Sequence, residues 1–153
     1  MAPGLLHYYF ANKDELLIEV LKDISDRYTV SGRQMSAALP AEQLGAAGLN
    51  DALQRTLHNP ESYRLRYEVF ALGLRNPALL LAVRSLLASG RSGISHVVHT
   101  AVGERSFDAS TLASILLACF DGLALQRLAE PDFDIESAYR LLSRMLNSLL
   151  ESA

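Results

Sequence analysis

Hydrophobic residues recur along most of this chain at intervals of three and four positions, the spacing that places side chains on one face of an α-helix. Leucine and alanine far outnumber valine and isoleucine, so helix formers dominate over β-branched residues. We therefore expect an all-α protein. The pattern predicts six helices, at about residues 13–37, 41–57, 60–74, 78–102, 109–129 and 135–150.

Short polar segments mark where these helices begin. Asparagine, aspartate and proline are the residues that cap or open a helix, and an acidic residue in the first turn favours the same position. The predicted starts are marked by Asn12 with Glu15, by Asn59-Pro60-Glu61, by Asn76-Pro77, and by Asp108 and Asp134. Within the helix at 41–57, the pattern is interrupted by Gly45, Gly48 and Asn50.

The last two helices carry more apolar surface than a single core needs. In the helix at 109–129, only a narrow strip around Ser114 and Asp121 is suited to solvent, and the helix at 135–150 is apolar over about half its circumference. Each fully buried leucine stabilises by about 1.5–3 kcal/mol, so leaving several of them in water would be unfavourable. A second subunit is the expected cover, and a plain monomer core is the alternative.

Composition limits the other possibilities. The 153 residues are 50% hydrophobic and carry a net charge of −3, and residues 1–30 hold three basic and five acidic side chains, so this chain should bind duplex DNA poorly by itself. The longest uninterrupted apolar runs, 78–83 and 115–120, are far shorter than the roughly 20 residues of a membrane span. With no secretory signal and a single cysteine, the chain is expected to be cytoplasmic, with no membrane partner.

The helix at 60–74 contains the main candidate binding residue. Arg66 projects into an otherwise apolar arc and needs a partner, either a carboxylate such as Asp121 or a polar or anionic ligand in a cavity lined by aromatic residues. Gln126 lies on an apolar sector of its own helix, and either lines the same cavity or forms a hydrogen bond at a dimer interface. The candidate ligand-binding residues are Tyr63, Arg66, Tyr67, Phe70, Phe120 and Gln126.

Signals for catalysis are weak. His96 and His99 fall on the polar side of their helix, and no acidic residue or cysteine joins them at metal-ligand spacing. Cys119 has no histidine or asparagine at nearby helical positions, and no glycine-rich phosphate loop follows a strand. We therefore expect no enzyme activity, no cofactor and no metal site. An all-α enzyme with an unrecognised site is the weakest of the functional hypotheses.

Residues 4–21, GLLHYYFANKDELLIEVL, resemble the end of the DNA-binding domain in the TetR family of bacterial transcriptional regulators. The resemblance implies that residues 1–30 are a remnant of a helix-turn-helix domain, containing the end of the recognition helix and the start of a connecting helix. Residues 31–153 would then form the ligand-binding and dimerisation domain. Gly4, Tyr8, Tyr9 and Lys13 are the candidate DNA contacts, through phosphate oxygens. A small aromatic core at Tyr8 and Tyr9 is the alternative.

The same resemblance implies a homodimer in which the last two helices of each subunit form a four-helix bundle. The stretches Phe120-Asp121-Gly122-Leu123 and Leu142-x-x-Met145-Leu146 look like the family's residues there. The expected interface residues are Leu112, Leu116, Leu123, Leu142, Met145, Leu146 and Leu149.

Two functional hypotheses follow. In the first, the protein is a ligand-responsive DNA-binding regulator, a repressor, that lacks most of its DNA-binding head and binds a small apolar or weakly anionic ligand. Operator DNA would be a partner only if the missing amino-terminal helices are present. In the second, it is a dimeric small-molecule-binding protein that does not bind DNA by itself.

Overall fold

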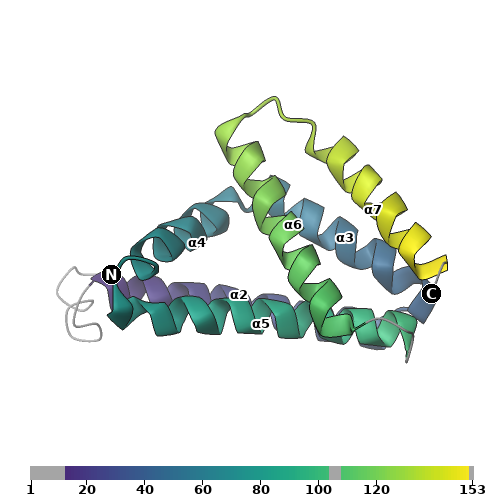
Figure 1. Ribbon diagram of the computed structural model, residues 1–153, viewed down its shortest axis with the longest axis horizontal. Coiled ribbons are helices and arrows are strands. Elements are labelled where there is room, and N and C mark those ends of the chain that lie inside the picture. The colour runs from purple at the N-terminus through teal and green to yellow at the C-terminus, as the bar shows by residue number, and fades with distance from the viewer. Residues whose placement is uncertain (1–12, 104–107, 152–153) are drawn as a thin grey trace.

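The computed structural model describes residues 13–103 and 108–151, and these ranges form six helices (Figure 1). The all-α prediction is confirmed, and each helix boundary lies within one residue of its expected position. The helices are α2 (Lys13–Ala38), α3 (Ala41–His58), α4 (Pro60–Gly73), α5 (Pro77–Val102), α6 (Ala109–Ala129) and α7 (Ile135–Glu151).

Side-chain caps explain where the last two helices begin. Asp108 accepts hydrogen bonds from the Ser110 amide at 2.9 Å and from the Thr111 hydroxyl at 2.7 Å. Asp134 caps α7 in the same way, accepting from the Ser137 amide at 3.0 Å. Both predicted caps are therefore confirmed.

Asn59 differs from its prediction. The helix α4 does begin with Pro60 directly after it, but the Asn59 side chain makes no capping hydrogen bond. Its amide instead donates to the Tyr28 hydroxyl of α2 at 3.3 Å. The proline, whose fixed φ suits the first helical position, is enough to start the helix without the cap.

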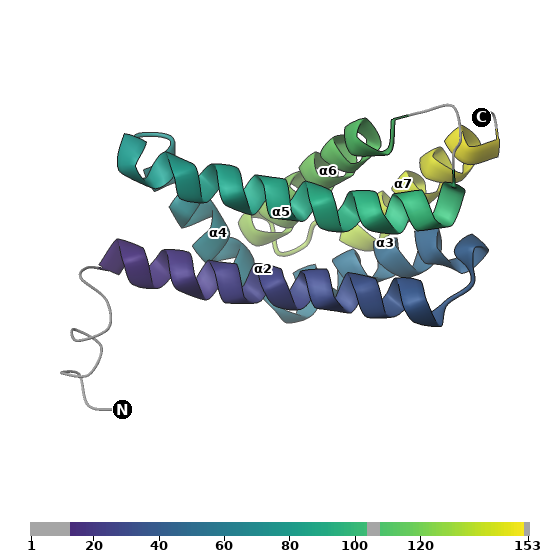
Figure 2. The ribbon, with the colours of Figure 1, turned by 90° about the horizontal axis from the view of Figure 1, so that it is seen from below.

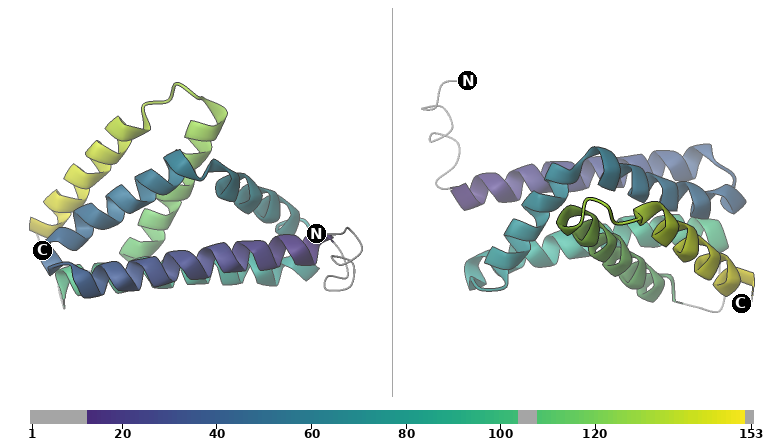
Figure 3. Two further views of the ribbon diagram at one scale, coloured as in Figure 1. Left: turned by 180° about the vertical axis from the view of Figure 1, so that it is seen from behind. Right: turned by 90° about the horizontal axis from the view of Figure 1, so that it is seen from above.

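The two longest helices form the base of the fold. Figure 2 shows α2 and α5 lying alongside each other, and they form the most extensive helix pair among the described residues. Viewed face on, α4 and α3 rise from opposite ends of this pair and close a triangular frame, which α6 crosses, and α7 lies beside α3 (Figures 1 and 3).

The buried hydrophobic residues form two clusters. The larger joins α3, α5, α6 and α7, where the rings of Phe120 and Tyr139 stack with centroids 6.0 Å apart. The smaller joins α2, α4 and α5 through Leu21, Val69 and Val83. The interior is thus packed as two separate centres in one helical frame.

The surplus of apolar residues on α6 and α7 is visible in the structure. Ile115 and Leu125 on α6 are 56% and 52% exposed, and Met145 on α7 is 61% exposed. By length and composition α6 is also apolar enough to cross a membrane, although it contains no long unbroken apolar run. Five of its residues are buried against the rest of the domain: Leu112, Ala113, Leu116, Phe120 and Ala124.

Candidate functional site

A cavity of about 170 Å³ lies inside the frame, and all six helices contribute to its wall. Members of both hydrophobic clusters line it, including Leu21 and Leu86 of the smaller and Leu49 and Leu116 of the larger. The cavity therefore lies where the two packed centres meet. Mostly apolar walls with a few polar groups are typical of small-molecule sites.

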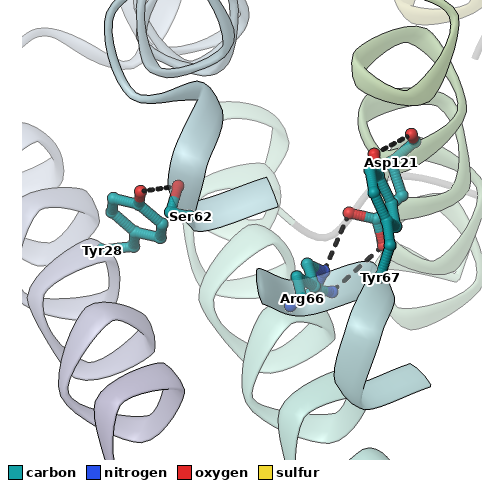
Figure 4. Close-up of polar contacts among 5 residues, drawn as sticks. All are labelled: Tyr28, Ser62, Arg66, Tyr67 and Asp121. Carbon is teal, nitrogen blue, oxygen red and sulfur yellow. Dashed lines mark hydrogen bonds and ion pairs between the residues drawn. The ribbon is translucent and has the colours of Figure 1, made fainter. Parts of the chain in front are cut away.

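The most strongly organised polar group at this wall is an ion pair between α4 and α6. Arg66 donates from Nε to Oδ1 of Asp121 at 3.0 Å and from an Nη to Oδ2 at 3.1 Å (Figure 4). The two side chains are only 13% and 19% exposed. Tyr67 donates its hydroxyl to the Asp121 carbonyl oxygen at 2.6 Å, and the Phe70 ring lies 4.7 Å from the Arg66 guanidinium.

These contacts decide between the two partners expected for Arg66. The guanidinium is paired within the chain by the carboxylate of Asp121, as one of the alternatives predicted. A two-point pair of this kind fixes both groups, because the planar fork of arginine matches the geometry of a carboxylate. It also means that Asp121 faces Arg66 instead of the solvent, contrary to the expectation for its strip of α6.

A second polar group lies where α2, α3 and α4 meet. The Tyr28 hydroxyl lies 3.2 Å from the Ser62 hydroxyl (Figure 4). The Ser62 hydroxyl in turn donates to the Asn59 carbonyl at 2.8 Å. The Arg55 guanidinium lies 4.5 Å from the centre of the Tyr28 ring and 3.4 Å from a carboxylate oxygen of Asp51.

Arg55 is held less completely than Arg66. Its ion pair is formed with a residue one turn earlier on the same helix, at the longer of the two distances. Its Nε is buried and has no hydrogen-bond partner among the described residues. Arg55 therefore has fewer of its donors paired by a carboxylate than Arg66, which is bound at two points by Asp121.

The phenols near this region stay neutral. Burial is the main cause that raises the pKa of Tyr63, Tyr67 and Tyr139 above the usual value for tyrosine. At neutral pH these hydroxyls can form hydrogen bonds but do not act as phenolate bases. Among the described residues, no three histidine, cysteine, aspartate or glutamate side chains are placed to hold a metal ion.

The structure separates the candidate ligand residues into three groups. Tyr63, Arg66 and Phe120 line the cavity. Tyr67 and Phe70 are not wall residues and instead hold the Arg66–Asp121 pair in place. Gln126 lies outside the cavity on the exposed side of α6, where its Nε2 donates to the Gly122 carbonyl at 3.4 Å.

Several wall residues were not found from the sequence. Tyr28 and Arg55 lie on helices with ordinary patterning, although the i, i+4 spacing of Asp51 and Arg55 was a visible signal of an ion pair. Glycines inside helices were the second signal, since helix interiors disfavour them. Five line the cavity: Gly32, Gly45, Gly48, Gly90 and Gly93.

The residues expected at a dimer interface are divided between the interior and the surface. Leu112, Leu116 and Leu146 are buried in the larger cluster, and Leu123 and Leu142 are partly buried against it. They lie inside because they occupy the faces of α6 and α7 that pack on this chain's own helices. Met145 and Leu149 are exposed, together with three residues that the expectation omitted, Ile115, Leu125 and Leu141.

The remaining candidates are the four possible DNA contacts and the two histidines of α5. Gly4, Tyr8 and Tyr9 fall outside the described residues, and Lys13 is the first residue of α2. His96 and His99 are exposed on α5, as expected from their polar face.

Comparison with known proteins gives one result. Residues 40–150 match the family model described as "Tetracyclin repressor-like, C-terminal domain". Searches of curated proteins and of solved structures gave no match. The matched range includes α3 to α6 and nearly all of α7, and so takes in most of the cavity wall. Since it covers well over half of the chain, the protein belongs to the TetR family of bacterial transcriptional regulators.

Proposed function

We propose that the protein is a ligand-responsive regulator, a repressor, in which occupancy of the cavity by a small molecule changes how the amino-terminal segment is presented to DNA. The observation that supports this proposal most directly is that α2 forms part of the cavity wall. Residues 4–21 resemble the end of a recognition helix followed by a connecting helix, and α2 begins within this range, at Lys13. A ligand that changes the preferred position of α2 would therefore act on the residues before it.

Specific contacts support this coupling. Leu21 of α2 is buried against Val69 and Val83, and Tyr28 of α2 forms its hydrogen bonds to Ser62 and Asn59 at the start of α4. These contacts hold α2 against the same helices that enclose the cavity. A ligand bound between these helices can shift α2 from one position to another only if its affinity for the protein differs between the two positions.

The functional unit in this proposal is a homodimer in the cytoplasm. Five surface-facing positions on α6 follow one another in alternating steps of three and four residues, the spacing found where two helices interlock. They are Ile115, Ala118, Gly122, Leu125 and Ala129. Exposed residues on α7 recur at every fourth position: Leu141, Met145 and Leu149. We name these eight residues the outer face. Its small residues would let a second copy approach α6 closely.

Selection of bound duplexes from a random-sequence DNA pool tests the regulatory part. The whole 153-residue chain is incubated with the pool, and the retained duplexes are sequenced. A dimeric regulator should enrich a sequence with two-fold symmetry, because each subunit reads one half-site. If no sequence is enriched by a protein that remains dimeric and folded, DNA regulation by this chain is excluded.

The alternative function is a dimeric small-molecule-binding protein that does not bind DNA by itself. Its specific support is the charge of residues 1–30, in which acidic side chains outnumber basic ones. Duplex binding depends largely on neutralising phosphates, which such a segment does poorly. The DNA selection separates the two functions, since only the first yields a sequence.

A further inference from the structure

The charges at the cavity wall cancel in pairs. Of the described residues that line the cavity, the charged ones are Asp51, Arg55, Arg66 and Asp121. Each arginine has its own aspartate, at 3.4 Å for Arg55 and at 3.0 Å for Arg66. The wall therefore carries two positive and two negative groups and offers no net charge to a ligand.

This balance disfavours charged ligands. An anion would be buried beside an arginine whose charge is already neutralised by its aspartate, and a cation beside an aspartate whose charge is already neutralised by its arginine. In a mostly apolar space, an unpaired charge is strongly unfavourable. A neutral molecule leaves both pairs intact.

One polar interaction is nevertheless available. The Arg55 guanidinium contacts Asp51 through an Nη atom, and its Nε has no acceptor among the described residues. A guanidinium carries five N–H donors. Because Arg66 is already bound at two points by Asp121, and the Nε of Arg55 is enclosed by protein, a ligand carbonyl would accept from an Nη group of Arg55.

The size of the space suits a ligand of about one ring. In another protein, a cavity of about 150 Å³ binds benzene, which is close to the volume here of about 170 Å³. Missing side chains help to create it. A Cβ built on Gly48 would meet only Val97 at 3.7 Å and Met35 at 3.9 Å, and one built on Gly93 would meet only Thr29 at 3.9 Å.

We propose that the cavity takes an uncharged molecule about the size of one substituted ring, carrying a single carbonyl-type acceptor that binds the guanidinium of Arg55. This inference rests on the proposed function, since it names the chemical class of the regulator's ligand. It excludes carboxylates and amines of the same size as preferred ligands.

Four probes with one ring in common test the proposal, namely acetophenone, ethylbenzene, benzoate and benzylamine. Their dissociation constants for the full chain are measured at neutral pH by protein-observed nuclear magnetic resonance titration. Acetophenone should bind about tenfold more tightly than ethylbenzene, which corresponds to one hydrogen bond from a charged donor. Benzoate and benzylamine should bind more weakly than either.

Two variants locate the interaction. Arg55→Met should reduce the affinity for acetophenone to that for ethylbenzene, whereas Arg140→Met should leave it unchanged. Arg140 is a matched control because it also pairs one turn away on its own helix, with Glu136 at 3.9 Å, and does not line the cavity. Gly48→Leu should abolish binding of every ring by filling the space, and Gly93→Val is the second filling variant if the first does not fold.

The outcomes distinguish the two levels of the proposal. If acetophenone and ethylbenzene bind equally, or if Arg55→Met changes neither affinity, the cavity binds ligands but the role of Arg55 is wrong. If benzoate or benzylamine binds most tightly, the neutral ligand class is wrong. Binding that survives both filling variants places the probes elsewhere and overturns the inference. If no probe binds at millimolar concentration, the ligand class is wrong, and the DNA selection tests the regulatory function separately.

Discussion

The pairing of Arg66 with Asp121 can be tested directly by substituting single residues. Asp121→Leu would leave the guanidinium of Arg66 mostly buried without its carboxylate. We expect the free energy of unfolding to fall by about 2 kcal/mol or more. The reason is that leaving one buried charge without its partner is more destabilising than removing both charges together. Chemical denaturation followed by circular dichroism measures this change.

Two further variants make this test specific. The double variant Arg66→Met with Asp121→Leu should be more stable than Asp121→Leu alone, since it removes the unpaired charge. Arg64→Ala, which breaks an exposed pair with Glu61, should change stability by less than about 1 kcal/mol. Equal losses in the single and double variants would show that the pairing of charge is not what stabilises this position.

Glycines in the helices give a second test, in which stability and binding change in opposite directions. Gly48→Ala should raise the free energy of unfolding by about 0.5–1 kcal/mol, because alanine is the better helix former and its methyl group fits without a clash. The same variant should weaken binding of ring-sized molecules by narrowing the cavity. Thermal melting and the titration described above measure the two effects.

Gly73→Ala is the matched contrast. A Cβ there would clash with the Val83 side chain, where α4 crosses α5, so this variant should lose stability. If both alanine variants were destabilising, the space around Gly48 would be filled in solution and the cavity smaller than described.

At the level of the helices, the N-caps give a prediction about pH. The hydrogen bond from the Thr111 hydroxyl is the main cause that lowers the pKa of Asp108 below its usual 3.8. A carboxylate with a lowered pKa stabilises the fold above the unfolded-state pKa, and this contribution is lost as the pH falls through the folded-state pKa. Thr111→Val should therefore raise the pKa of Asp108. It should also reduce the contribution that the Asp108 carboxylate makes to the free energy of unfolding and that is lost in acid.

Titration of the carboxyl carbon signals by nuclear magnetic resonance measures that pKa. Ser114→Ala is the control, since the Ser114 hydroxyl donates to the Ser110 carbonyl and does not contact Asp108. An unchanged Asp108 pKa in Thr111→Val would contradict the cap as described.

Helix positions were predictable, and the faces of α6 were not. Proline and aspartate act locally, so Pro60 at the start of α4 and Asp108 before α6 could be recognised from their neighbours alone. In contrast, α6 is apolar on nearly every side, so its sequence pattern cannot say which leucine faces inward. Leu116 was expected at an interface and is buried in the core, while Ile115 beside it is exposed.

The part of the site that was predictable depends on a charged side chain that must have a partner. Arg66 stood out because a charge in an apolar arc requires a partner, and Asp121 was among the partners expected. Arg55 and Tyr28 come together only through the packing of α2 on α3 and α4, which no local pattern encodes.

At the scale of the whole molecule, the outer face predicts self-association. Met145→Glu places a charge in that face and should convert a dimer to a monomer at micromolar concentration, since burying an unpaired carboxylate is unfavourable. Analytical ultracentrifugation measures the mass. Leu81→Glu is the control, because Leu81 is 71% exposed, lies on α5 and does not belong to the outer face, so this variant should leave the mass unchanged. A wild-type protein that sediments as a monomer would exclude the dimer.

The glycines in the cavity wall also have a consequence for how such a protein diversifies. A glycine codon becomes an alanine codon through a single base change, and at Gly48 or Gly93 the added methyl group meets no close neighbour. Each step would reshape the space for a bound molecule while the surrounding helices keep their positions. Descendants of one gene can in this way acquire new chemical preferences without passing through an unfolded ancestor.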